Sequence, residues 1–285
     1  MLVADRKDAQ LHRILRDREG LRVFAALDEN GNISQEMMDR ACRSVAAMQE
    51  KAKKLGAQCV HLFATSAVRD ARNQERFSAA LEEATGLRLE ICSGDEEARL
   101  SFLGATEGRR AGMIDIGGGS TEIVVGEGET FDFAESLQMG AVRLYRLSPI
   151  ASVEDARRVR RIAAELLAPK REALLRLVQP DEWFGVGGTF TTTAALVQGI
   201  SWTDKERVHG FRARREVIER VSDLLAPMSM EERLKLPGLQ PQRADIVVHG
   251  LAILLACMES LELSSITVSE YGNLEGYLKR RYLDA

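Results

Sequence analysis

The sequence predicts an α/β fold, and three observations support this. Short apolar runs typical of strands alternate with longer stretches typical of helices through the first half of the chain. The 285 residues are 45% hydrophobic and 29% charged, as in a globular protein with a sizeable core. Two glycine turns, near residues 117 and 187, each directly follow a strand-like run. The length suits one large domain or two of moderate size.

The first part of the chain is predicted to begin with a hairpin. Leu11–Leu15 and Leu21–Phe24 are apolar runs on either side of a polar turn at Asp17–Gly20. A helix follows over about residues 35–55, with Ser34 as its N-cap and a glycine near its end.

Strands and helices then alternate up to the predicted domain boundary. The apolar run Cys59–Ala64 predicts a strand that leads into the loop Thr65–Arg69. A helix capped by Asn73 runs to about residue 85, where a glycine stops it, and Leu87–Cys92 forms the next strand. Ser93 begins another helix with the spacing of a capping box.

The chain changes character in the polar, glycine-containing stretch Gly104–Gly112. We therefore predict an N-terminal domain of residues 1–106 and a C-terminal domain of residues 107–285. The predicted strands of the second domain are Met113–Ile116, Glu122–Val125, Trp183–Val186 and Ile266–Val268, and its predicted helices are Val153–Val178, one beginning near Phe190, Ile246–Met258 and Leu274–Tyr282.

Composition and charge exclude several classes of protein. The 39 basic and 43 acidic side chains give a net charge of −4, so we expect no generally polybasic nucleic-acid binder and no DNA partner. The four cysteines and four histidines are scattered singly, which argues against a zinc site or a disulfide framework. The longest apolar stretch, Ile246–Met258, falls short of the roughly 20 residues that span a bilayer, so we expect no membrane partner. No signal peptide opens the chain, so we expect a cytoplasmic protein.

The segment Ile114–Glu122 carries the strongest chemical signal. Its three glycines let backbone N–H groups approach an anion without a Cβ in the way, and two hydroxyls add donors. The predicted phosphate-binding residues are Gly117, Gly118, Gly119, Ser120 and Thr121. Asp115 and Glu122 flank the turn and could hold a hydrated Mg²⁺ beside the phosphate. The alternative is a hairpin turn with ordinary surface acids.

Three further segments have both a functional and a structural interpretation. Gly187 and Gly188 lie between a strand and a helix, where they could contact an anion or simply allow close packing. Arg69, in a loop after a strand, could clamp a phosphoryl group or face solvent. The basic stretch Arg157–Arg161 could guide a polyanion or form a solvated helix face balanced by acids. No Walker loop, dinucleotide-binding Gly-x-Gly-x-x-Gly or Gly-x-Ser-x-Gly elbow fits the glycine segments.

Four segments together resemble one family. Ala64–Arg69, Ser93–Leu100, Ile114–Glu122 and Glu135–Arg143, in that order and at those spacings, are similar to the exopolyphosphatase and guanosine pentaphosphate phosphohydrolase family. The resemblance implies two actin-like, ribonuclease-H-like domains around a cleft. It also implies Mg²⁺-dependent removal of terminal phosphate from polyphosphate or pppGpp.

The resemblance also implies roles for individual residues. Glu97 matches the catalytic base of the family, and Arg69 matches its phosphate-contacting arginine. Asp115 and Glu122 match its metal and phosphate acids, and the turn after Ile116 matches its second phosphate loop. Gly187 and Gly188 fall in its later glycine-rich turn.

One departure concerns the start of the chain. The family begins with a strand and an Asp-x-Gly-Ser/Thr-Asn-Ser loop, whereas here Met1 stands where that loop should already have ended. We expect either that the true start lies upstream or that half of the phosphate grip is lost. The sequence thus predicts a phosphoanhydride hydrolase, with a catalytically weak polyphosphate or alarmone sensor as the main alternative and a small-molecule kinase as a weaker one. It leaves the oligomeric state, a homodimer included, open.

Overall fold

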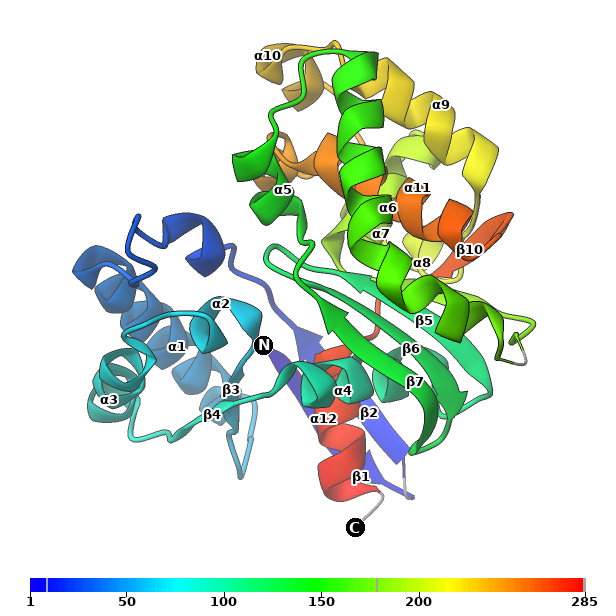
Figure 1. Ribbon diagram of the computed structural model, residues 1–285. Coiled ribbons are helices and arrows are strands. Elements are labelled where there is room, and N and C mark those ends of the chain that lie inside the picture. Colours follow the sequence, from blue (N-terminus) through cyan, green and yellow to red (C-terminus); the bar gives the residue numbers. More distant parts are fainter. Residues whose placement is uncertain (9, 178, 284–285) are drawn as a thin grey trace. The chain divides into compact units, whose positions relative to one another are not determined.

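The chain forms two compact units in the computed structural model, which describes residues 1–8, 10–177 and 179–283 (Figure 1). Unit 1 comprises Met1–Glu97 and the chain from Tyr277 onward, and unit 2 comprises Ala98–Gly276. The sequence placed the division after residue 106 and had no return of the chain to the first unit. The two divisions differ because helix α4 (Gly94–Thr106) passes from unit 1 into unit 2 without any turn residue to mark the change.

Unit 1 contains two small sheets and a helical layer. In chain order its elements are β1 (Leu2–Lys7), β2 (Gln10–Arg16), the 3-10 helix η1 (Val23–Ala26), α1 (Gln35–Lys54), β3 (Leu62–Ala64), α2 (Ser66–Arg69), α3 (Gln74–Thr85) and β4 (Leu89–Ile91). β1 and β2 pair antiparallel, whereas β3 and β4 pair parallel. Buried Ile33, Met38, Phe77 and Leu81 belong to the core beneath α1 and α3.

The predicted position of the first hairpin was wrong. The hairpin is β1–β2, with Leu2 opposite Arg16, and the second predicted strand is the 3-10 helix η1. Arg22 adopts a left-handed backbone conformation at φ 57°, which interrupts any extended strand before η1. Among the described hairpin residues, only Val3 is buried, so apolar alternation gave little guidance here.

The predicted ends of the first helices were mostly right. Ser34 caps α1 by accepting a hydrogen bond from the backbone N–H of Met37. Gly86 ends α3 in the left-handed conformation, at φ 69°. Asn73 precedes α3 as predicted, but its side chain does not cap the helix. It bonds instead to the backbone N–H and C=O of Ile33, 40 residues away in sequence.

Unit 2 is built on a mixed sheet, six-stranded within the described residues. Its elements are β5 (Ala111–Ile116), β6 (Thr121–Glu127), β7 (Thr130–Leu137), α5 (Ala141–Leu147), α6 (Val153–Leu175), β8 (Trp183–Val186), α7 (Gly188–Gln198), α8 (Lys205–Val208), β9 (Arg212–Arg214), α9 (Arg215–Leu225), α10 (Met230–Leu234), η2 (Pro241–Arg243), α11 (Val247–Ser260) and β10 (Ser265–Val268). Helix α12 (Asn273–Tyr282) then leads from unit 2 back to unit 1.

The strand order places both glycine turns at one edge of this sheet. The order is β7-β6-β5-β8-β10-β9, and β8 runs parallel to both β5 and β10. The carboxyl ends of β5 and β8 therefore lie at the same edge, which is the usual ligand edge of an α/β sheet. Strand β7 had no predicted counterpart. It is an edge strand, and none of its residues is fully buried, so its apolar signal is weak.

The apolar stretch predicted as a buried helix is α11. All its residues from Val247 to Met258 are buried, and the helix packs against α5, α6, α7 and α9. Among the described residues, no helix is both long and apolar enough to span a lipid bilayer.

Helix α6 begins at the predicted residue and ends at Leu175, earlier than predicted; the predicted end, Val178, lies outside the described residues. Arg160 of α6 forms ion pairs with Glu219 and Glu259. Such pairing favours the interpretation of the basic stretch as a helix face balanced by acids.

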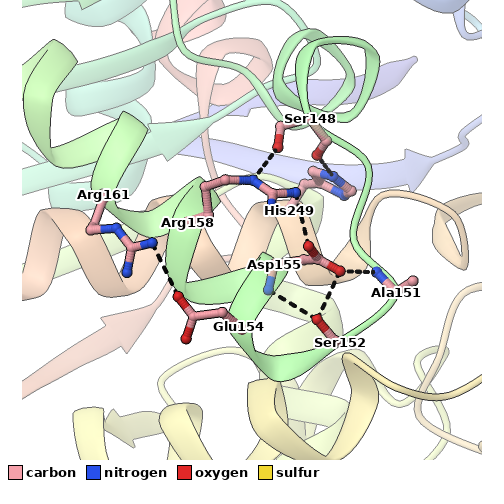
Figure 2. A network of polar contacts seen from close by, with 8 residues as sticks. All are labelled: Ser148, Ala151, Ser152, Glu154, Asp155, Arg158, Arg161 and His249. Atoms are coloured by element: carbon pink, nitrogen blue, oxygen red, sulfur yellow. Dashed lines mark hydrogen bonds and ion pairs between the residues drawn. The ribbon is translucent and has the colours of Figure 1, made fainter.

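The connection between α5 and α6 is held by a polar network (Figure 2). Ser152 caps α6 by accepting a hydrogen bond from the N–H of Asp155, whose carboxylate accepts one from the Ser152 hydroxyl at 2.8 Å. Arg158 pairs with Asp155 and donates to the hydroxyl of Ser148. The ring of buried His249 bonds to the carbonyl of Ser148 at 3.0 Å. The network therefore fixes α5 and α6 on α11.

Candidate active site

Unit 1 contains a carboxylate–guanidinium pair in which the acid is buried and the arginine is half-buried. Arg69 is the last residue of α2, and Glu97 lies in the first turn of α4. Arg69 Nη1 donates to Glu97 Oε2 at 3.0 Å and to the carbonyl oxygen of Cys92 at 2.9 Å. Glu97 is 8% exposed. The structure thus brings together two residues that the sequence analysis took from separate motifs.

The surroundings of this pair suit Glu97 as a general base and Arg69 as a binding group for an anion. Burial raises the pKa of Glu97 above its usual value, although Arg69 and hydrogen bonds from Thr65 and Ser66 act to lower it. Arg69 Nη2 is buried and has no hydrogen-bond partner among the described residues. A buried donor without an acceptor is costly, and a phosphoryl oxygen is an acceptor that guanidinium groups bind well.

Unit 2 contains the glycine turn between β5 and β6. The backbone N–H of Gly117 donates to the carbonyl oxygen of Ser120 at 3.0 Å, which closes the turn over Gly118 and Gly119. Ser120 is almost fully buried, at 1% exposure. The hydroxyl of Thr121 donates to the carbonyl oxygen of Met139 at 2.6 Å, so the structure gives it a role in holding the loop.

A row of polar side chains crosses the sheet beside this turn. Asp115 of β5 is paired in register with Glu122 of β6, which is paired with Ser136 of β7. Residues directly opposite each other in antiparallel strands share a face of the sheet. The hydroxyl of Ser136 donates to Glu122 at 2.7 Å, and that of Ser101, on α4, donates to Asp115 at 2.8 Å.

The two acids of this row fit a magnesium ion better than a zinc ion. Both offer hard carboxylate oxygens, and Mg²⁺ is commonly held by one or two carboxylates together with water and substrate phosphate. Within the described residues, no group of three or more His, Cys, Asp and Glu side chains could enclose a metal. Asp115 and Glu122 therefore suit an ion that shares its coordination with a bound phosphate.

The second glycine turn lies against an acid and an arginine. Gly187 has φ 90°, and a Cβ at this position would lie 2.8 Å from Asp115 Oδ1. A Cβ at Gly188 would lie 1.7 Å from Cζ of Arg243. A side chain at either glycine would therefore force the neighbouring charged group to move, and the positive φ of Gly187 itself favours glycine. Arg243, Ser101 and Ser136 were not predicted from the sequence; the only signal for Arg243 was its place just before the apolar stretch of α11.

Comparisons with known proteins agree along nearly the whole chain. The model of the Ppx/GppA phosphatase family matches residues 2–284. Exopolyphosphatase 2 of Mycobacterium tuberculosis (strain H37Rv) is 31% identical to this chain, with 94% of this chain and 88% of the relative covered. Exopolyphosphatase 1 of Mycobacterium leprae is 29% identical, with 92% and 79% covered.

Solved structures show the same likeness. An exopolyphosphatase from Cytophaga hutchinsonii matches with a TM-score of 0.88 and 25% identity, covering 99% of this chain and 93% of that one. The Aquifex aeolicus PPX-GPPA enzyme matches with a TM-score of 0.82 and 26% identity, covering 97% and 93%.

Proposed function

The chain belongs to the Ppx/GppA phosphatase family, and from that premise we propose that it removes the terminal phosphate of inorganic polyphosphate. It is a hydrolase of phosphoanhydride bonds, as its exopolyphosphatase relatives indicate. The observation that carries the proposal is the Glu97–Arg69 pair. Its acid is buried and has a raised pKa, and the buried Arg69 Nη2 has no acceptor among the described residues.

In this proposal Glu97 is the general base. Its carboxylate takes a proton from a water molecule as the water oxygen attacks the terminal phosphorus, and the bridging oxygen leaves with the shortened chain. The products are orthophosphate and a polyphosphate one unit shorter. Phosphoryl transfer of this kind depends on positioning and electrostatics, so no nucleophilic side chain is needed.

The terminal phosphoryl group is held by backbone and side-chain donors. Arg69 Nη2 and the N–H groups of Gly118, Gly119 and Ser120 supply the hydrogen bonds in our proposal. Asp115 and Glu122 would hold Mg²⁺. The ion would neutralise charge on the phosphate oxygens when bound.

The same chemistry extends to a nucleotide substrate. The 5′-terminal phosphate of pppGpp is joined by the same kind of phosphoanhydride bond, and we propose it as a second substrate. Phosphate release from polyphosphate and from pppGpp, measured side by side with Mg²⁺, gives the preference.

The proposal is tested by Glu97→Gln. This change keeps the size of the side chain and removes the base, so turnover of polyphosphate should fall about 100-fold or more while polyphosphate binding persists. Asp95→Asn is the matched control, since Asp95 is an exposed acid on the same helical turn, and it should leave turnover unchanged. Unchanged turnover in Glu97→Gln would remove Glu97 from the reaction. Binding without turnover in the wild-type protein would favour a sensor.

A further inference from the structure

Helix α5 lies directly against the glycine turn of unit 2. The carbonyl oxygen of Gly117 accepts a hydrogen bond from the N–H of Ala141 at 2.9 Å, and that of Gly118 accepts one from Val142 at 3.0 Å. The carbonyl of Gly119 accepts one from the N–H of Gly140 at 3.1 Å. The first N–H groups of a helix have no partners within the helix, so the turn and the helix end satisfy each other.

These contacts fix which way the N–H groups of the turn point. In a trans peptide the C=O and the following N–H point in opposite directions, and the described chain has no cis peptide bond. Because the carbonyls of Gly117, Gly118 and Gly119 face α5, the N–H groups of Gly118, Gly119 and Ser120 face away from it. Within the described residues, none of these three N–H groups donates to a backbone carbonyl.

The close approach of α5 depends on a glycine at its N-cap. A Cβ at Gly140 would lie 2.3 Å from the carbonyl carbon of Gly118 and 2.4 Å from that of Gly119. Any other residue would push the helix end away from the turn.

Arg143 adds a side chain to this backbone contact. Its Nε donates to the carbonyl oxygen of Gly119 at 2.8 Å, and its Nη2 donates to the side-chain oxygen of Gln138. Of the three carbonyls, Gly119 is therefore the one that also receives a charged donor. Such a donor strengthens the dipole of the Gly119–Ser120 peptide and makes the Ser120 N–H a better donor.

We propose that Arg143 is a positioning residue for the phosphate loop, holding the Gly119–Ser120 peptide so that the Ser120 N–H faces the bound phosphate. Arg143 acts through this peptide and does not itself touch the substrate. The inference rests on the proposed function, because it assigns the loop to phosphate binding.

The test compares Arg143→Gln and Arg143→Lys with the wild-type protein. Arg143→Gln should raise both KM for polyphosphate and the inhibition constant of inorganic phosphate about 10-fold, since a hydrogen bond to a charged group is lost. Arg143→Lys can still reach Gly119 with one charged donor, so it should restore most of that loss. Arg146→Gln is the matched control, because Arg146 is an exposed arginine three residues further along α5.

The possible outcomes separate failure of the role proposed for Arg143 from failure of the proposed function. If Arg143→Gln lowers only the melting temperature and leaves KM and phosphate inhibition unchanged, the residue is structural and the inference fails. If the wild-type protein neither releases phosphate nor binds it, the proposed function fails first. A measurement that needs no variant is the NMR titration of the wild-type protein with inorganic phosphate. The amide signals of Gly118, Gly119 and Ser120 should shift, and unmoved signals would overturn the inference.

Discussion

Neither Arg69 nor Glu97 indicates a catalytic site by its residue type and position alone, but the contact between them does. Arg69 and Glu97 are 28 positions apart in sequence, and each type of residue is common at a helix end for structural reasons. Their 3.0 Å contact, together with the burial of Glu97, makes them a candidate catalytic pair. The family resemblance predicted their roles. The sequence could not predict the burial that raises the pKa of Glu97, or the buried Arg69 Nη2 that has no acceptor in the part of the chain the structure describes.

The raised pKa of Glu97 predicts the acid side of the pH profile. A general base acts only when ionised, so kcat/KM should fall as the pH drops, with a midpoint above the ordinary glutamate value of 4.5. Arg69→Gln removes a charge that stabilises the carboxylate, so the midpoint should move to still higher pH. The measurement is the pH dependence of polyphosphate hydrolysis in both proteins. A wild-type midpoint at or below 4.5, or a downward shift in the variant, would contradict the assignment.

The second glycine turn makes a prediction about Arg243. Gly188→Ala places a methyl group where the guanidinium lies, so Arg243 must move and kcat/KM should fall about 10-fold or more. Arg243→Met removes the same group directly and should have a similar effect. Because the two changes act on one contact, the double variant should be little worse than either single variant. Fully additive losses would show that Gly188 matters for another reason.

At the scale of elements, one buried arginine joins several helix ends. Arg233 of α10 is 6% exposed and donates to the carbonyl oxygens of Leu225, Ala226 and Ala244. The first two lie at the end of α9, where backbone carbonyls have no partner within the helix.

Arg233→Met should therefore destabilise the protein through those carbonyls. We expect a loss of about 3 kcal/mol in the free energy of unfolding, because buried acceptors lose charged donors. Lys235→Met, two residues away, removes only an exposed ion pair with Glu231 and should cost less than about 1 kcal/mol. Urea denaturation of both variants gives the comparison, and equal losses would argue against a special role for Arg233.

Elements were predictable where a local signal was strong. Helix caps and continuous burial depend on residues close together in sequence. The sequence therefore located the start of α1 at Ser34, the end of α3 at Gly86 and the buried helix α11. The hairpin β1–β2 and the edge strand β7 have only one fully buried residue between them, Val3, so apolar periodicity did not identify them. The side chain of Asn73 shows a third case. The sequence suggested that it caps the start of α3, but it bonds to the distant backbone of Ile33.

At the scale of the whole molecule, the predicted actin-like α/β fold is confirmed by the likeness to solved family members. The division of the chain was harder to predict. Tyr277 stacks on Phe63, with ring centroids 4.7 Å apart, and donates to Glu90, while Tyr282 contacts His61 at 2.6 Å. These partners are up to 221 residues apart, and no local pattern encodes such contacts.

The return of the chain to unit 1 has a consequence for the order of synthesis (Figure 1). Unit 2 is one continuous stretch, so all of it has been made before the ribosome adds Tyr277 and the residues after it. Phe63 and Glu90 of unit 1 lack their contacts with Tyr277 until that residue has been made. Unit 1 therefore needs residues from both ends of this sequence, whereas unit 2 needs none after Gly276.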